Sequence, residues 1–299
     1  MMRICLLYCF LVLSSLQLFA QQDAQYTGYM FNTQVYNPAY TGSRGVPSVL
    51  AYYRQQWLNI NTAPQSLALS FQSPIKDKNM ALGFHVESDW IGVHNRLSAF
   101  ASYAYIINTN KGNIALGLQA GLLNTASNFS KVETLDGYDP IYDSDVDKLS
   151  PNFGAGIYYY SDLFYIGASV PHLLNQDISV ADAKQSRHYF FTTGFLLSPS
   201  KNFRIKPSVL VKVVPNEAPV SVDATVNFII HNALWLGVSH RWKESVSFLA
   251  QYQINKNLRL GYAYDYPLSK LYNWWGTHDF FIGYEWGFSN DRVLTPRYF

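Results

Sequence analysis

Apolar and polar residues alternate with a period of two along most of the chain beyond residue 47. In residues 278–288, Phe280, Ile282 and Tyr284 would point to one side of a strand, and Asp279 and Glu285 to the other. Residues 114–122, 220–230 and 258–266 repeat this pattern. Because successive side chains of a strand point to opposite faces, each segment predicts a strand with one apolar face and one face of glycine, small and charged residues.

The same analysis of the whole chain predicts fourteen strands, an even number as in most single-chain bacterial barrels. They are residues 48–57, 66–73, 80–87, 96–107, 113–124, 152–160, 163–170, 188–198, 203–214, 220–230, 233–242, 245–254, 258–266 and 278–288. After residue 20, no apolar run approaches the ~20 residues of a transmembrane helix. The pattern therefore predicts an all-β fold, a transmembrane antiparallel up-and-down β-barrel whose outer face meets lipid and whose interior is polar.

The connections between these strands predict an orientation. Those after even-numbered strands are short, whereas those after odd-numbered strands include the long ones at residues 125–151, 171–187 and 267–277. Outer-membrane barrels have short periplasmic turns and longer extracellular loops. An even strand count then places both chain ends in the periplasm.

The chain before the first strand divides into two parts. Residues 1–20 resemble a signal peptide, with Arg3 ahead of an apolar stretch at residues 4–12 and cleavage expected after Ala20. A membrane anchor is the alternative, but the apolar stretch is too short to span comfortably. The only cysteines, Cys5 and Cys9, lie in this leader, so the mature chain is expected to form no disulfide and no cysteine-type zinc site.

Residues 21–47 form a non-strand N-terminal segment ahead of the barrel with its C-terminal tail at residues 48–299. Two hypotheses are compatible: the segment packs into the lumen as a plug, or it meets a periplasmic partner. The candidate residues are Tyr29, Met30, Phe31, Asn32, Asn37, Pro38, Ala39, Tyr40 and Gly42.

Composition supports the membrane assignment. Aromatic residues make up 16% of the chain and charged residues only 14%, whereas soluble domains average about 25% charged residues. A soluble protein of this composition would have difficulty hydrating its surface. The net charge of +2, with no basic cluster along the sequence, gives no indication of a nucleic-acid partner.

Several charged residues fall on the predicted inner face of the C-terminal strands. They are Asp223, Arg259, Asp265, Asp279 and Glu285. They could line a selective pore or bind a cargo segment, but pairing across strands that satisfies buried charge is the favoured interpretation.

Alternate aspartates at residues 136–147 suggest calcium, but the spacing of an EF-hand fails because Lys148 and Gly154 stand where glycine and glutamate are required. A solvated acidic loop is favoured, and a weak divalent-cation site stays open. The aromatic residues Tyr158, Tyr159, Tyr160, Trp242, Trp274 and Trp275 predict girdles at the membrane interfaces.

No catalytic motif is present: the chain lacks a nucleophile elbow, a His-Glu-x-x-His zinc motif and a phosphate loop. His278 and Asp279 are adjacent on a strand and face opposite sides. No enzymatic activity and no cofactor are expected.

The N-terminal segment also carries a family resemblance. Residues 22–32, Gln-Asp-Ala-Gln-Tyr-Thr-Gly-Tyr-Met-Phe-Asn, and residues 36–42, Tyr-Asn-Pro-Ala-Tyr-Thr-Gly, resemble the mature N-terminus of the PorP/SprF family of Bacteroidetes. Residues 54–57, 63–66, 261–266, 278–284 and 296–299 resemble later motifs of that family, so the likeness covers nearly the whole mature chain. His278-Asp279 departs from the His-Glu of many members but keeps the charge.

The resemblance implies a component of the type IX secretion system and, in gliding species, of surface-adhesin attachment. Its implied partners are outer-membrane lipid, secreted or surface proteins with C-terminal sorting domains, and periplasmic type IX or peptidoglycan-associated components. The first hypothesis is thus a non-enzymatic interaction protein of the outer membrane. The alternative is a pore or transporter for small or apolar solutes.

Overall fold

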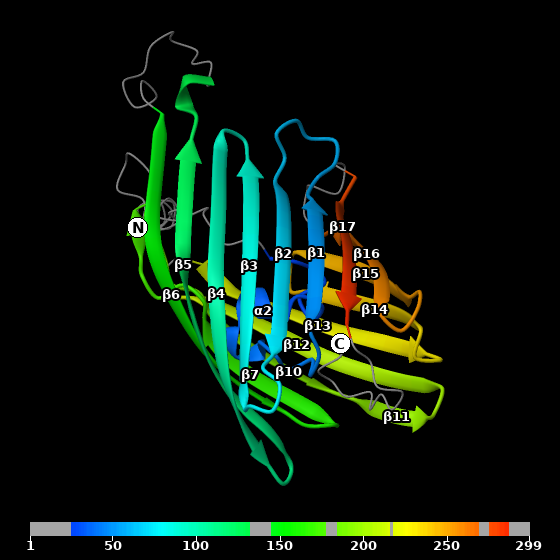
Figure 1. The fold of residues 1–299 in the computed structure, drawn as a ribbon. Coiled ribbons are helices and arrows are strands. Elements are labelled where there is room, and N and C mark those ends of the chain that lie inside the picture. The colour runs from blue at the N-terminus through cyan, green and yellow to red at the C-terminus, as the bar shows by residue number, and fades with distance from the viewer. Residues whose placement is uncertain (1–24, 132–144, 178–183, 216–217, 269–274, 287–299) are drawn as a thin grey trace, which may run out of the picture.

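The computed structural model describes residues 25–131, 145–177, 184–215, 218–268 and 275–286, which form a closed antiparallel β-barrel (Figure 1). Its strands are β1 (Ser48–Gln55), β2 (Gln65–Pro74), β3 (Met80–Ile91), β4 (His94–Thr109), β5 (Gly112–Ser127), β6 (Val146–Tyr160), β7 (Phe164–Val170), β10 (Tyr189–Phe195), β11 (Leu197–Ser200), β12 (Phe203–Val214), β13 (Ala218–Ile230), β14 (Leu234–Arg241), β15 (Ser245–Gln253), β16 (Leu258–Pro267) and β17 (Thr277–Glu285).

From β1 to β7 and from β12 to β17, each strand pairs with the next, and β1 pairs with β17. Between these two series, β10 pairs with both β7 and β12, and β11 pairs with β12. The short strands β10 and β11 are separated by Leu196 alone and occupy one position in the wall. The barrel therefore has fourteen strands, which confirms the predicted fold. Two further strands of two residues each, β8 (Gln176–Asp177) and β9 (Lys184–Gln185), pair with each other outside the barrel sheet.

The alternation seen in the sequence sets the two faces of the wall. In β5, Ala115, Gly117 and Gln119 are buried, whereas Leu116 and Leu118 are exposed. The outer face is thus apolar, as a lipid-facing surface requires, and the inner face is polar or small. Among the described residues, no helix is long and apolar enough to cross a membrane.

Some strands extend beyond their predicted ends. Strands β5 and β6 stay paired from Asn113 and Tyr160 as far as Ser127 and Val146, so β6 starts before residue 152 and the predicted 125–151 loop is shorter. Here polar residues such as Asn124 and Lys148 interrupt the apolar rhythm. A strand that rises above the lipid keeps its backbone pairing but no longer needs an apolar outer face, which is why alternation missed it.

The two ends of the barrel differ in their connections. The long-loop end carries residues 56–64, 128–145, 171–188 and 268–276, together with shorter connections. The short-turn end carries residues 75–79, 110–111, 161–163, 201–202, 231–233 and 254–257. The chain enters β1 at the short-turn end, as predicted.

The first described residue lies at the other end. Gln25 hydrogen-bonds Asp223 beside Arg241, the last residue of β14, near the long-loop end. The described chain therefore starts near the long-loop end, whereas both chain ends, whose predicted place is the periplasm, lie outside the described residues. Residues 25–47 then run the length of the lumen before β1 begins.

The outer face supports a direct test in the wall. Leu118 in β5 is 62% exposed and lies within the apolar belt. Replacing Leu118 by arginine is expected to destabilise the barrel by about 2–4 kcal/mol, because a cation near the bilayer midplane loses its hydration. Leu149→Arg, near the long-loop end, serves as the matched control and should change the unfolding free energy by about 0–1 kcal/mol. Urea unfolding in lipid vesicles measures both, and equal effects would contradict a lipid-facing β5.

Candidate functional site

Residues 25–47, here called the lumen segment, pass through the inside of the barrel. Every residue from 26 to 44 is buried. Figure 1 shows its short helix α2 (Thr33–Tyr36) enclosed by the strands. The segment contacts strands all around the wall: Tyr29 Oη donates to Ser208 Oγ of β12 at 3.1 Å, and Gln34 Nε2 donates to the Phe71 carbonyl of β2 at 3.0 Å.

The Asn-Pro-Ala-Tyr stretch has a specific geometry. Asn37 caps the 3-10 turn η1 (Pro38–Tyr40), because its side-chain oxygen accepts from the Ala39 N–H at 2.9 Å. The Asn37 amide also donates to the Ile157 carbonyl of β6 at 3.1 Å. Pro38 suits the first position of such a turn, where its missing N–H has no intrahelical partner to lose. One asparagine thus shapes the turn and ties it to the wall.

Glycines in the wall make room for this turn. A Cβ on Gly117 of β5 would lie 2.1 Å from the Ala39 backbone nitrogen, and one on Gly156 would lie 2.1 Å from Asn37 Oδ1. At the end of the turn, Gly42 has a φ of +79°, which favours glycine. The small inner face of β5 and β6 and the shape of the lumen segment therefore fit each other.

Aromatic rings fill the rest of the lumen. Phe31 stacks on Phe281 of β17 with ring centroids 4.6 Å apart, and Tyr52 stacks on the same ring at 5.6 Å. Tyr40 packs edge-on against Tyr158 at 5.5 Å. These contacts make the lumen segment part of a hydrophobic core rather than a loose insert.

One group of buried charges, the long-loop cluster, holds the start of the segment. Arg54 of β1 binds Asp265 at 2.9 Å and Asp279 at 2.7 Å, and all three side chains are buried. The Thr27 hydroxyl donates to Asp265 at 2.5 Å, and the Thr27 N–H donates to Asp279 at 3.1 Å. Tyr52 donates to Asp279 at 2.6 Å. Two wall carboxylates thus share one arginine, and they bind the hydroxyl and the backbone N–H of Thr27 in the lumen segment.

A second group, the short-turn cluster, holds the end of the segment. Arg44 binds Glu285 at 2.7 Å, and Arg259 binds the same carboxylate at 3.3 Å. Arg44 also donates to the Tyr40 hydroxyl at 3.1 Å. The lumen segment is therefore fixed near its start by hydrogen bonds from Thr27 to ion-paired carboxylates and near its end by the ion pair of Arg44 with Glu285, with its aromatic residues between them.

Comparisons with known proteins identify the family and the fold. A family model described as type IX secretion system membrane protein PorP/SprF matches residues 18–284. The chain belongs to the PorP/SprF family. No curated protein matches it. The barrel lies in the outer membrane of a Gram-negative bacterium, in keeping with its family and its barrel fold.

Two solved structures resemble the chain in fold. The toluene transporter TbuX of Ralstonia pickettii is 12% identical, with a TM-score of 0.52 over 84% of this chain and 92% of that chain. The outer membrane protein Omp33 of Acinetobacter baumannii is 7% identical, with a TM-score of 0.47 over 80% and 96%. At such identities the likeness concerns the fold alone.

In this PorP/SprF chain, the five charged residues singled out from sequence all face the lumen and are buried. Asp265 and Asp279 lie in the long-loop cluster, and Arg259 and Glu285 in the short-turn cluster. Asp223 pairs with Arg241 at 2.7 Å, and Arg241 lines the same pocket as Arg54 and Asp265 of the long-loop cluster. Three arginines that form ion pairs with the carboxylates among these five residues, Arg44, Arg54 and Arg241, were not among the predicted lumen charges. For Arg54 a signal existed, because it alternates in phase with the inward Tyr52.

The candidate residues that the sequence predicted for the lumen segment are all buried inside the barrel. They lie in the stretches Tyr29–Asn32 and Asn37–Gly42. Asn32 accepts from the Ser70 hydroxyl at 2.8 Å, and Gly42 donates to the Gln72 side chain at 2.7 Å. Their polar groups are therefore directed at the wall.

The girdle prediction is wrong for Tyr158 and Tyr160. Their rings are buried and pack against each other at 5.6 Å, because even-numbered residues of β6 point inward. Three consecutive tyrosines must alternate, and the triplet itself does not say which face each one takes. Trp242 and Trp275 are exposed at the long-loop end, and Trp274 lies outside the described residues.

Only the end of the acidic loop falls within the described residues. Asp145 accepts from the Ser130 N–H at 2.9 Å, and Asp147 accepts from the Asn124 amide at 2.6 Å. In the described part of the chain, no group of three or more metal-ligating residues occurs. Asp136, Asp139 and Asp143 lie outside it, as does the predicted signal peptide.

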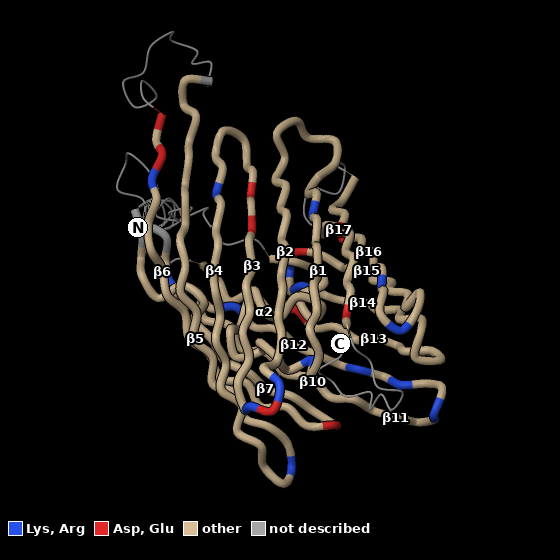
Figure 2. Tube along the Cα trace, in the orientation of Figure 1, with Lys and Arg blue, Asp and Glu red and all other residues tan. Residues whose placement is uncertain are grey.

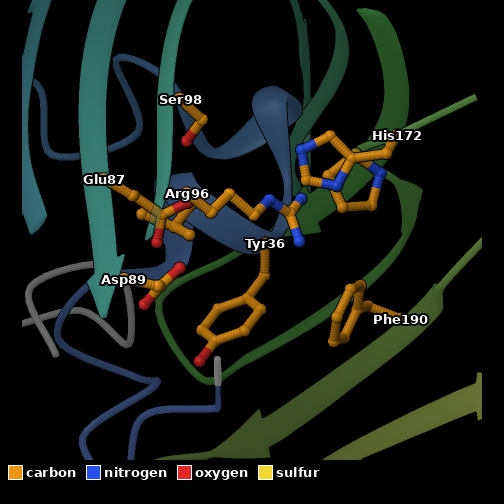
Figure 3. Close-up of a pocket in the computed structure, with 9 residues that line it drawn as sticks. Tyr36, Glu87, Asp89, Arg96, Ser98, His172 and Phe190 are labelled. Carbon is orange, nitrogen blue, oxygen red and sulfur yellow. The ribbon is translucent and has the colours of Figure 1, made fainter. Parts of the chain in front are cut away.

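A small pocket lies beside the lumen segment towards the long-loop end. Its lining includes Tyr36, Glu87, Asp89, Arg96 and His172. Figure 3 shows the Arg96 side chain reaching across it from the side of Glu87 towards His172. The Tyr26 hydroxyl donates to Glu87 at 3.0 Å. This mixture of charges belongs to the lining of the barrel mouth, where the loop after β7 folds inward.

The long-loop cluster predicts a strong dependence on Arg54. Arg54→Met leaves Asp265 and Asp279 buried without their cation and should destabilise the barrel by about 3–5 kcal/mol. Adding Asp265→Asn and Asp279→Asn removes the uncompensated charge and should restore much of the loss. Chemical unfolding of the single and triple variants measures both effects. A triple variant as unstable as Arg54→Met would show that charge pairing is not what the cluster supplies.

Proposed function

We propose that this PorP/SprF protein is a non-enzymatic outer-membrane component that serves export or surface attachment of cargo through protein contacts rather than by passing solutes. The observation that carries the proposal is the buried lumen segment, in which every residue from 26 to 44 lies inside the barrel. An interior occupied by the chain's own residues leaves the two ends of the barrel as the surfaces for partners.

The orientation follows from the connections. We infer that the long-loop end faces outward and the short-turn end faces the periplasm, as is usual for outer-membrane barrels. Residues 1–20 serve as the signal peptide in this scheme. Candidate partners are then secreted or surface proteins with C-terminal sorting domains at the outer end, and periplasmic type IX or peptidoglycan-associated components at the inner end. A role in gliding and an origin in Bacteroidetes belong to the same proposal.

The alternative function is transport of small or apolar solutes. Its support is the fold shared with TbuX, which is named as a toluene transporter. Fold alone does not imply function, and the filled lumen weighs against free passage.

Conductance separates the two functions. Purified wild-type protein in planar bilayers is expected to show no steady open-channel current. Gly117→Leu should produce current, because its side chain occupies the place of the Ala39 backbone, only 2.1 Å from a Cβ at residue 117. Leu116→Met, on the exposed face of the same strand, is the matched control and should stay silent. Steady current through the wild-type barrel would instead favour the transporter.

Co-purification tests the partners. The tagged barrel, solubilised from native membranes, should enrich proteins with C-terminal sorting domains or a periplasmic anchoring component over an unrelated barrel of equal abundance, as measured by quantitative mass spectrometry. Repeated recovery of the barrel alone would count against the adaptor function, whatever the conductance.

A further inference from the structure

The short-turn end of the barrel is basic, although no basic cluster exists in the sequence. Among the described residues, the exposed charged residues at this end are Lys76, Asp77, Lys78, Lys111, Asp162, Lys201 and Lys256. Five lysines against two aspartates give a net charge of +3. Arg204, half-buried at the start of β12, adds another cation and hydrogen-bonds Asn232. Figure 2 shows these cations on turns that are far apart in the chain.

The long-loop end has no such bias among the described residues. Its exposed charged residues are Asp145, Asp147, Lys148, Arg187, Lys243 and Glu244. Three cations and three acids cancel. The basic character is therefore a property of one end rather than of the protein surface as a whole.

The lysines lie immediately beyond the lipid-facing belt. Exposed Ile107 of β4 is followed by Lys111 in the next turn, and exposed Ile254 precedes Lys256. A lysine in this position can keep its aliphatic stem along apolar surface while its ammonium group reaches the headgroup level. The turns that carry lysine are β2–β3, β4–β5, β11–β12 and β15–β16, which are spread around the circumference. A ring of this kind fits a leaflet, whereas docking of a protein would favour cations gathered on one side.

We propose that the short-turn end binds the anionic headgroups of the phospholipid leaflet that it faces. The ligand class is a phospholipid with net negative charge, such as phosphatidylglycerol, held by the lysine ring through its phosphate. The assignment to the periplasmic leaflet depends on the proposed orientation of the barrel. The presence of the lysine ring, which consists of Lys76, Lys78, Lys111, Lys201 and Lys256, does not depend on that orientation. Such binding would fix the depth and tilt of the barrel and present its periplasmic end at a defined height.

Lipid titration of the purified full-length barrel tests the proposal. In neutral detergent, phosphatidylglycerol should bind by native mass spectrometry and raise the melting temperature, whereas phosphatidylcholine should not. Each lysine is expected to contribute about a fivefold factor in apparent affinity at low ionic strength, and the difference between the two lipids should shrink in high salt. The test variant is Lys76→Gln/Lys78→Gln/Lys111→Gln/Lys201→Gln, and the matched control is Lys148→Gln/Arg187→Gln/Lys243→Gln at the other end.

The outcomes are distinct once heat-modifiability on gels shows that both variants are folded barrels. Loss of the phosphatidylglycerol response in the test variant alone supports the proposal. An unchanged response in that variant, or an equal response to phosphatidylcholine, overturns it. A stronger response to lipid A through the same lysines would move the ring to the outer leaflet and overturn the leaflet assignment. If the test variant keeps its lipid response but loses periplasmic proteins in co-purification, the ring is a protein-docking surface instead. Conductance is expected to be unaffected in every case, so failure here leaves the proposed function standing.

Discussion

A charged group inside a closed barrel must find a partner there, because the wall separates it from bulk water and the desolvated charge is costly when unpaired. Arg54 meets this constraint for Asp265 and Asp279, and Arg44 with Arg259 meets it for Glu285. The lumen segment contributes to both clusters: Thr27 donates a hydrogen bond to Asp265 in the long-loop cluster, and Arg44 forms an ion pair with Glu285 in the short-turn cluster. The wall and the segment therefore stabilise each other: the wall carboxylates accept hydrogen bonds from Thr27, and Glu285 pairs with Arg44 of the segment.

The width of the barrel explains why such a segment is present. An interior of about eight strands is just wide enough for side chains to fill, and this wall has fourteen positions. Side chains of the wall cannot fill that space unaided. A chain segment that enters with its own Tyr, Phe and Met residues can fill it, provided that the wall is small where the backbone passes. Gly117 and Gly156 meet that condition, and the stacking of Phe31 on Phe281 shows the result.

Much of the wall could be predicted from sequence, because a period of two with one apolar face has few other structural meanings. The strand ends above the lipid could not, since β5 and β6 continue where Asn124 and Lys148 interrupt the rhythm. A plug was one of the two hypotheses for the N-terminal segment, but the path of the lumen segment could not be predicted from the sequence. Its residues have no periodicity, and their burial depends on partners more than a hundred positions away, such as Asp279 for Thr27. The inward direction of Tyr158 and Tyr160 in β6 was not predicted, because three identical residues in a row do not show which of them point inward.

The same packing limits how this PorP/SprF protein can work. A mechanism that opens the lumen must break the hydrogen bonds of Thr27 with Asp265 and Asp279, or the ion pair of Arg44 with Glu285. Loss of that ion pair leaves the buried Arg44 without its carboxylate, which is costly. The aromatic contacts between the clusters oppose it further. A mechanism that uses only the ends of the barrel breaks none of these contacts, and the two ends already differ in loop length and charge. Exchange with partners at the ends is therefore favoured over movement of material through the lumen.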